Sequence, residues 1–435
     1  SASPLIVMWS VWRGQVPTLG YAAFDATIGP NPAPLHKPRV GERSAENAFV
    51  PISLNDDGTV DVVDRRTGTR YARCAEIRDV GDVGDEYNYS PPASDRRITS
   101  ADATDVRIAR VHAGPVRTVF RVDAMLPLPV AASNDRTARA AATVANAPSM
   151  LVVLHADSPR VGFHVTVHNR SRDHRLRLLF PTGADGLAEV RAETAFGVVR
   201  RPARREIPAQ VRNEVPVSYA PTISFTEAGS ERAGVIVFGE GLTEYEALPG
   251  ENGTGARVAL TLLRAVGYLS REDLAMRPSG HAGPGLPTPG AQCLGTHHFR
   301  AAFEPRAEAP PASALFARAA TFTASPYVVA AAGPGGSLAV TDSFLTLESP
   351  RGAAVLSACQ RATHRDSLLV RVFNPDDRPA TVRLGTRANK TVQAFRVDLL
   401  ENRVEELGVR NGTVDVAVGP HQIATIEILN ADSEF

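Results

Sequence analysis

Four carboxylates stand close together in one short stretch of this chain. Asp79, Asp82, Asp85 and Glu86 lie within residues 79–92 (DVGDVGDEYNYSPP), together with two tyrosines and two glycines. Like charges this close repel one another, so backbone N–H groups, a cation or a hydroxyl-rich partner must stabilise them. Glycines allow the tight turns that bring such side chains together. The stretch therefore predicts a polar loop that binds a ligand or fixes a shape, with a solvated acidic turn as the simpler alternative.

Two further clusters combine charge with aromatic or imidazole groups. In residues 173–177 (DHRLR), we expect Asp173 to pair with Arg175 or to orient His174, and so to fix a turn. Residues 244–246 (EYE) form a second acidic aromatic turn. Carbohydrate sites use such residues, because an aromatic face packs on C–H bonds while charged groups hydrogen-bond the hydroxyls.

The elements that must position these residues are predicted to be strands, so the fold class is all-β. Short runs of alternating apolar residues recur between Gly, Pro and Asp, whereas helical periodicity is scarce. The predicted strands include residues 118–125, 161–168, 175–180, 234–238, 258–263, 368–373 and 414–418. Two Ala-rich segments, 136–145 and 312–320, are predicted as short helices, and the first fits a surface insertion equally well.

Composition narrows the class of protein. The 435 residues carry 47 basic and 47 acidic side chains, which argues against the basic footprint of a nucleic-acid binder. Cys74, Cys293 and Cys359 are odd in number and far apart, so a reducing compartment, the cytoplasm, is favoured over a disulfide framework. No run approaches the ~20 apolar residues of a membrane span, and the first residues lack the pattern of a signal peptide.

Pro-, Gly- and Ala-rich segments divide the chain. Residues 330–337 are the best candidate boundary. We expect an N-terminal linker with edge strands at 1–39, a large β domain at 40–335 and a small β-sandwich at 336–435.

Several short segments, taken in order, carry a resemblance that covers nearly the whole chain. They are VPTLGY (16–21), DGT (57–59), DRRTG (64–68), GDVGDEYNYSPP (81–92), Asn169, DHRLR (173–177), GLTEYE (241–246), TLLRAVGYLSR (261–271), AGP (282–284), QCLG (292–295), FNP (373–375) and PHQIATI (420–426). The ordered set resembles the C-terminal β region of the family 38 glycoside hydrolases, the class II α-mannosidases. The resemblance implies a large mutarotase-like β-supersandwich followed by a small immunoglobulin-like sandwich.

The resemblance also implies where the chemistry resides. Family members hydrolyse α-mannosides with retention, using two carboxylates and a zinc ion that holds mannose hydroxyls. These groups lie on an N-terminal catalytic domain that has no counterpart here. We therefore expect no catalytic or metal-binding residue in this chain, zinc in the missing catalytic domain, and a hydrolase of mannose metabolism that is inactive as this isolated part.

By resemblance, the loop at 79–92 lends residues to the sugar pocket. Tyr87 matches a tyrosine that contacts the bound sugar, and Arg271 matches an arginine of the same pocket, with Arg264 as a competing match. Asp82, Asp85 and Glu86 would then line the rim, where they bind hydroxyls or fix the loop's shape, and the carboxylates would be exposed without their partner domain. The expected partners are an α-mannoside and the catalytic domain of the same enzyme, and a homo-oligomer is compatible with the sequence.

Two alternatives belong to other classes. A stand-alone carbohydrate-binding module would bind mannosides without a partner domain. A mutarotase-like enzyme would need a histidine and a carboxylate as acid and base across one pocket, for which His164, His168 and His174 are the candidate sources.

Overall fold

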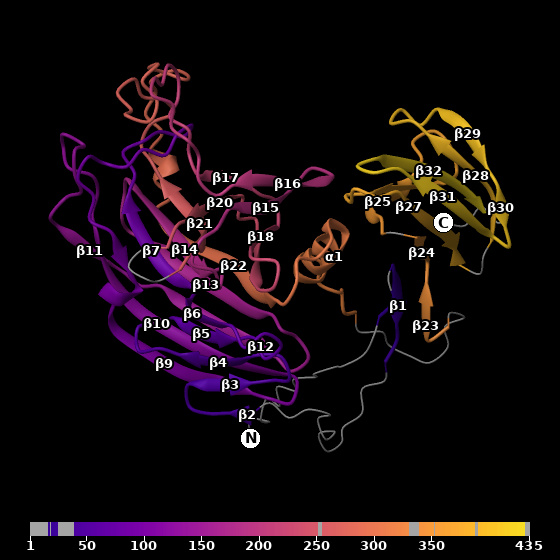
Figure 1. Ribbon diagram of the computed structural model, residues 1–435, viewed down its shortest axis with the longest axis horizontal. Coiled ribbons are helices and arrows are strands. Elements are labelled where there is room, and N and C mark those ends of the chain that lie inside the picture. Colours follow the sequence, from indigo (N-terminus) through magenta and orange to yellow (C-terminus); the bar gives the residue numbers. More distant parts are fainter. Residues whose placement is uncertain are drawn as a thin grey trace, which may run out of the picture. The chain divides into compact units, whose positions relative to one another are not determined.

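The computed structural model describes residues 16–17, 19–24, 39–250, 255–329, 339–351, 353–387 and 390–430. The chain forms two compact units (Figure 1). The larger unit comprises Ala33–Thr194 and Val199–Ala309, and the smaller comprises Ser1–Pro32, Ala195–Val198 and Pro310–Phe435. The predicted boundary segment at 330–337 lies outside the described residues. Strands dominate both units, which confirms the all-β class.

The larger unit contains a ten-stranded antiparallel sheet. Its order is β11-β10-β12-β13-β22-β19-β18-β15-β16, and β9 also pairs with β10. The strands are β9 (Thr104–Ala113), β10 (Arg117–Pro129), β11 (Thr143–Asn146), β12 (Ser149–His155), β13 (Val161–Asn169), β15 (Glu189–Thr194), β16 (Gly197–Pro202), β18 (Phe225–Gly229), β19 (Gly234–Glu240) and β22 (Gly295–Arg306). On β13 the apolar residues are buried in alternation, as the sequence predicted.

Two smaller sheets complete this unit. The six-stranded sheet has the order β17-β20-β21-β14-β7-β8, and the five-stranded sheet runs β2-β3-β4-β5-β6. Their strands are β2 (Arg39–Val40), β3 (Ser44–Glu46), β4 (Pro51–Leu54), β5 (Val60–Val63), β6 (Arg70–Cys74), β7 (Glu76–Gly81), β8 (Ile98–Thr99), β14 (His174–Pro181), β17 (Tyr219–Pro221), β20 (Glu244–Leu248) and β21 (Arg257–Ala265). Short 3-10 helices lie at Ser100–Asp102 and Pro289–Gln292.

One apolar core joins the three sheets. Phe163 of β13, Phe180 of β14 and Phe303 of β22 belong to it, and Phe180 stacks on Phe303 at 6.1 Å. Because side chains alternate across a strand, Leu176 and Leu178 of β14 enter this core while their neighbours Arg175 and Arg177 face the other way. The six-stranded sheet therefore has one apolar and one charged face.

The smaller unit has a separate core. Its four-stranded sheet has the order β24-β27-β31-β30, its five-stranded sheet has the order β25-β26-β32-β28-β29, and β1 pairs with β23. The elements are β1 (Gly20–Ala22), α1 (Ala312–Thr323), β23 (Thr341–Ser343), β24 (Leu345–Arg351), β25 (Val355–Arg361), β26 (Leu368–Phe373), β27 (Ala380–Thr386), β28 (Thr391–Val397), β29 (Arg403–Leu407), β30 (Val409–Arg410), β31 (Thr413–Val418) and β32 (Ile423–Asn430). Helix α1 confirms the prediction at 312–320. No helix in the described ranges is long and apolar enough to cross a membrane.

The helix predicted at 136–145 is wrong. This segment folds back on the end of β10, with Ala140 N donating to Ala131 O at 2.9 Å and Val130 N donating to Ala142 O at 3.0 Å. Arg136 adopts a positive φ of 59°, which is not helical. The polar turn chemistry of Ser133 and the residues after it outweighs the helix propensity of the alanines.

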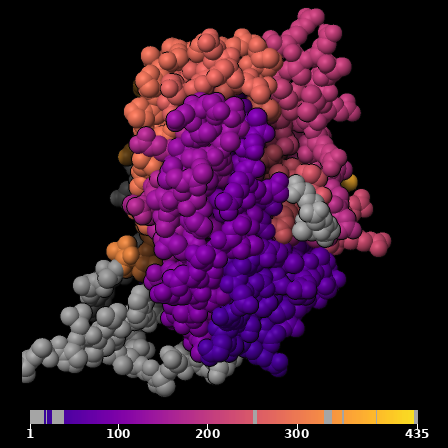
Figure 2. All heavy atoms as spheres, turned by 90° about the vertical axis from the view of Figure 1, so that its left-hand side faces the viewer, coloured from indigo at the N-terminus to yellow at the C-terminus, as the bar shows by residue number. Residues whose placement is uncertain are grey.

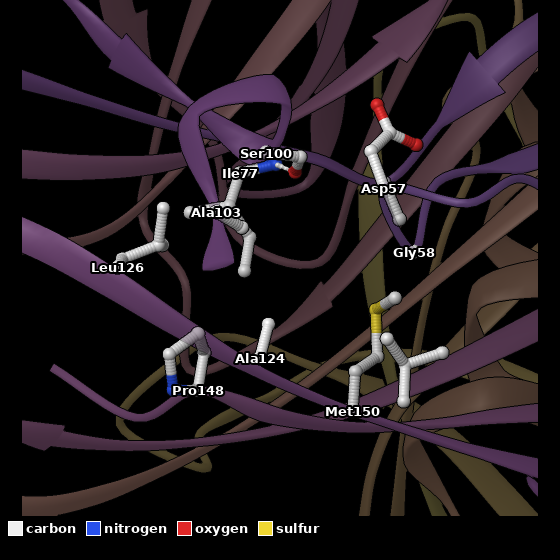
Figure 3. Close-up of a pocket in the computed structure, with 11 residues that line it drawn as sticks. Asp57, Gly58, Ile77, Ser100, Ala103, Ala124, Leu126, Pro148 and Met150 are labelled. Atoms are coloured by element: carbon white, nitrogen blue, oxygen red, sulfur yellow. Dashed lines mark hydrogen bonds between the residues drawn. The ribbon is translucent and has the colours of Figure 1, made fainter. Parts of the chain in front are cut away.

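A small cavity lies in the larger unit, between the turn that joins β4 and β5, the start of β7, the 3-10 helix at Ser100–Asp102 and β10 (Figure 3). Its volume is about 20 Å³, and its lining includes Ile77, Leu126 and Met150. That volume is enough for about one water molecule. It is too small for a sugar, so this cavity is not the candidate site.

Candidate functional site

The loop that follows β7 is closed by a tight turn at Gly84. Asp85 N donates to Asn88 O at 3.1 Å, and Val83 N donates to Ser90 O at 2.8 Å. A Cβ on Gly84 would lie 2.0 Å from Asn88 O, so only glycine fits this approach. We call residues 82–92 the acidic loop.

Asp82 shapes this loop from beneath. Its side chain has no exposed surface, and its Oδ1 accepts hydrogen bonds from Gly84 N at 2.9 Å and Ser90 N at 3.3 Å. Its Oδ2 accepts from Arg264 Nε at 2.8 Å. The carboxylate is therefore satisfied within the protein.

Asp85 is equally enclosed and connects more of the site. Its Oδ1 accepts from the backbone N–H groups of Tyr87 at 3.0 Å and Asn88 at 2.9 Å. Its Oδ2 accepts from Arg271 N at 2.8 Å and from Arg277 Nη2 at 2.5 Å. Burial alone would raise the pKa of Asp85, but the hydrogen bonds from Arg277 and from the backbone lower it below its ordinary value.

The carboxylates of Asp79, Asp82 and Asp85 are not exposed, contrary to the expectation from the sequence. All three have 0 % exposure. Asp79 contacts Arg139, and His174 Nδ1 lies 2.5 Å from its Oδ2. Only Glu86 is exposed among the four acids, and its backbone N–H donates to Tyr268 O at 3.1 Å. Within this group, the role of fixing the loop's shape is the one that the contacts of Asp82 and Asp85 support.

The cluster at 173–177 fixes a turn, but through other partners than we expected. Asp173 accepts from Gln292 Nε2 at 2.9 Å and from Ala132 N at 3.3 Å. His174 is oriented by Asp79 and by Asn169 Oδ1, 3.0 Å from its Nε2. Asp173 therefore neither pairs with Arg175 nor orients His174.

The residues 244–246 form part of β20 rather than a turn. Glu244 accepts from Arg175 Nη2 at 2.7 Å, and Glu246 accepts from Arg175 Nη1 at 3.3 Å. The guanidinium of Arg175 has no exposure and lies over the rings of Tyr89, at 4.7 Å, and Tyr219, at 5.2 Å. This group supports the acidic loop from the charged face of the sheet.

Tyr87 stands at the surface of the acidic loop, with 53 % exposure. One side of its ring faces Gly283, where an added Cβ would come within 2.8 Å of the phenol oxygen. Within the part of the chain that the structure describes, no residue hydrogen-bonds its hydroxyl. The exposed half of this residue is therefore open to a ligand.

Both candidate arginines contact this loop. Arg271 donates to Asp273 through Nε at 2.9 Å and Nη2 at 2.6 Å, and its guanidinium lies 4.9 Å from the Tyr268 ring. Arg264 donates through Nη2 to Asp85 O at 3.0 Å as well as to Asp82. Their side chains are 17 % and 18 % exposed, so either could reach a ligand and both matches stay predictions.

Segment 266–294 contacts the acidic loop through Arg271 and Arg277, and segment 203–218 in turn contacts segment 266–294. Segments 203–218 and 266–294 are loops at one end of the larger unit in Figure 1, joined by a hydrogen bond from Val215 N to Met276 O at 2.9 Å. Figure 2 shows the orange atoms of segment 266–294 against the pink atoms of 203–218. The sequence analysis did not single out Arg277, and it included Ser270 and Gln292 only as members of the motifs at 261–271 and 292–295. Arg277 contacts Asp85, Ser270 contacts Arg277, and Gln292 contacts Asp173.

The histidines named for an acid–base role lie apart. His164 and His168 are exposed on β13 of the ten-stranded sheet, whereas His174 is buried on β14 of the six-stranded sheet. Among the described residues, no group of three or more His, Cys, Asp and Glu side chains could hold a metal ion.

Comparison with known proteins identifies the family. The model of the glycosyl hydrolases family 38 C-terminal domain matches residues 45–273, and that of the family 38 C-terminal beta sandwich domain matches residues 353–426. The chain belongs to glycosyl hydrolase family 38, in agreement with the resemblance read from its motifs.

Individual relatives agree with this assignment. The chain is 23 % identical over 426 residues to a Halalkalibacterium halodurans protein named "Putative mannosylglycerate hydrolase", covering 94 % of this chain and 44 % of that one. A solved alpha-mannosidase from Enterococcus faecalis V583 is 26 % identical with a TM-score of 0.75, covering 89 % of this chain and 42 % of its own. A second family 38 structure from Enterococcus faecalis is 25 % identical with a TM-score of 0.74, and the match covers 89 % of this chain and 44 % of that one. The chain thus spans less than half the length of these relatives.

Proposed function

We propose that this chain is the C-terminal β region of an α-mannosidase-like glycoside hydrolase, and that it supports and partly lines a carbohydrate site completed by a preceding catalytic region. Family membership and the names of the relatives support the reaction class. In this proposal the substrate is an α-mannoside, hydrolysed with retention, and zinc belongs to the catalytic region. A cytoplasmic location is part of the same proposal.

The observation that carries the proposal is the contrast between Tyr87 and the carboxylates beneath it. Tyr87 is half exposed, while Asp82 and Asp85 are enclosed and hold the backbone around it. A binding residue gains most when its neighbours fix it before the ligand arrives. An exposed ring on such a loop suits the C–H face of a sugar, and its hydroxyl suits a sugar oxygen.

The same contacts support the proposal that the chain is inactive alone. A glycosidase acid must hold a proton near neutral pH, and its nucleophile must reach the anomeric carbon. Asp85 has a lowered pKa and no exposed surface, so it suits neither role. Asp82 is likewise enclosed, with its oxygens bonded to Arg264 and the loop backbone.

Turnover of an aryl α-mannoside and zinc content test the proposal. Both should be measured on this 435-residue chain and on the protein that also carries the catalytic region. We expect turnover and zinc in the longer protein and neither in this chain. Turnover by this chain alone would overturn the proposal, and mannoside binding by this chain in calorimetry would favour a stand-alone binding module.

A further inference from the structure

We infer that Arg277 is a positioning residue of the proposed sugar site, holding Tyr87 and Arg271 in place through the carboxylate of Asp85. The inference rests on the proposed function of Tyr87. Arg277 itself is 1 % exposed, so it acts through its neighbours rather than by touching a ligand.

The guanidinium of Arg277 connects the acidic loop to segment 266–294. On the acidic loop, Nη2 donates to Asp85 Oδ2 at 2.5 Å, and Nη1 contacts Asn88 Oδ1. Within its own segment, Nη2 donates to Arg271 O at 2.8 Å, and Nε donates to Gly280 O at 2.7 Å. One planar cation therefore fixes the spacing of two loops that are distant in sequence.

Asp85 connects Arg277 to Tyr87 and Arg271, the two residues predicted to contact the sugar. Its Oδ1 accepts from Tyr87 N, and its Oδ2 accepts from Arg271 N. Without Arg277 the buried carboxylate of Asp85 would lose its cation. Because an unpaired buried charge is costly, either water would enter to hydrate the carboxylate or the carboxylate would take up a proton. Either change weakens the two backbone hydrogen bonds that place Tyr87 and Arg271.

A second route leads from Arg277 to the Tyr87 ring. Arg277 Nη2 lies 3.3 Å from Ser270 Oγ, which accepts from Ala282 N at 2.9 Å and Gly283 N at 3.2 Å. Gly283 is the residue that faces the Tyr87 ring. The same guanidinium thus organises both the backbone of Tyr87 and the surface on which its ring rests.

A purely structural arginine would also destabilise the protein when replaced, so the test must separate the two roles. We propose kinetics of the complete enzyme for Arg277→Gln, Tyr87→Phe and the double variant, at a temperature well below unfolding. Arg277→Lys is the conservative variant, since an ammonium group can still pair with Asp85 but cannot span its other acceptors. Arg257→Gln is the matched control, because Arg257 is also buried and pairs with Glu76 at 3.0 Å, between β21 and β7 of the six-stranded sheet.

A positioning role predicts a specific pattern. Arg277→Gln should lower kcat/KM about 10- to 100-fold, and Tyr87→Phe should then cost less than about twofold more, because the ring is already misplaced. Arg277→Lys should recover part of the loss, whereas Arg257→Gln should leave the effect of Tyr87→Phe unchanged. Full, independent losses from Tyr87→Phe and Arg277→Gln in the double variant would overturn the inference.

Hydrogen exchange on the 435-residue chain gives a readout that does not depend on activity. In Arg277→Gln we expect faster exchange of the Tyr87 and Arg271 amides, with the amides of β13 unchanged. Unchanged exchange at Tyr87 and Arg271 would contradict the inference even if activity fell. If Tyr87→Phe alone leaves kcat/KM unchanged while exchange rises as expected, the proposed function fails and the positioning contact stands.

Discussion

The carboxylate of Asp85 and the guanidinium of Arg277 form an ion pair of 2.5 Å in which the side chains are 0 % and 2 % exposed. The pair is enclosed between two loops, and the only exposed acid of the acidic loop is Glu86. The sequence suggests a cluster of free charges, but in the folded chain Asp82 and Asp85 are paired and hold the backbone of the loop that carries Tyr87. Buried charges of this kind persist because each is paired and hydrogen-bonded.

Removing Asp82 should destabilise the chain strongly. Asp82→Ala leaves Arg264 without its carboxylate and removes the acceptor of Gly84 N and Ser90 N. We expect a loss of about 3 kcal/mol in the free energy of unfolding, measured by urea denaturation. Asp273→Ala is the control, because that carboxylate is 58 % exposed and should cost less than about 1 kcal/mol. Equal losses for both variants would contradict this account of the loop.

Glycine at position 84 should be required. In Gly84→Ala the new methyl group would meet Asn88 O, a backbone atom that cannot turn aside. We expect a loss of about 1 to 3 kcal/mol and a displaced acidic loop. Gly186→Ala is a suitable comparison, because nothing lies within 4 Å of a Cβ there. A neutral Gly84→Ala would show that the turn is less tight than described.

Glu427 of β32 should make stability depend on pH. Burial raises the pKa of this carboxyl, but hydrogen bonds from Arg403, Ser367 and Arg365 lower it to about 2. The stabilisation is therefore complete above the unfolded-state pKa and is lost as the pH falls toward about 2.

The matching variant is Glu427→Gln, which cannot titrate. At pH 7 the variant should be less stable than the wild type. This difference in unfolding free energy should become smaller by about 2 to 3 kcal/mol between pH 7 and pH 2, because the wild type loses the stabilisation by its charged carboxylate. Denaturation curves of the 435-residue chain at several pH values would measure it. A deficit that does not change with pH would show that the three donors do not stabilise the charged form.

Local sequence pattern was enough to predict much of the fold. Alternation predicts β13 correctly, because one face of the strand enters the core and the period of two is visible in its residues; in β14 the alternation extends only to Leu178. It failed at 136–145, where alanines suggested a helix but the polar turn after Ser133 and a positive φ at Arg136 made a hairpin. Local propensity loses to turn chemistry in so short a segment.

The site was predictable in part. The charged residues of the acidic loop are recognisable in the sequence, whereas the role of Tyr87 rests on the family resemblance and stays a prediction. The partners of the acids could not be predicted from local sequence, since Arg277 lies 192 residues from Asp85 and no local pattern joins them. The exposure of the carboxylates was misjudged for the same reason, because it depends on arginines that only the folded chain brings near.

The most direct test of the proposed role is Tyr87→Phe in the complete enzyme, with kcat/KM measured on an aryl α-mannoside. The change removes one hydroxyl that no described residue hydrogen-bonds, on a half-exposed side chain, so the free energy of unfolding of the 435-residue chain should stay within about 0.5 kcal/mol of the wild type. If Tyr87 contacts the sugar, kcat/KM should fall about 3- to 10-fold, as expected for one hydrogen bond lost. Unchanged kcat/KM at unchanged stability would contradict the claim that this β region lines the carbohydrate site.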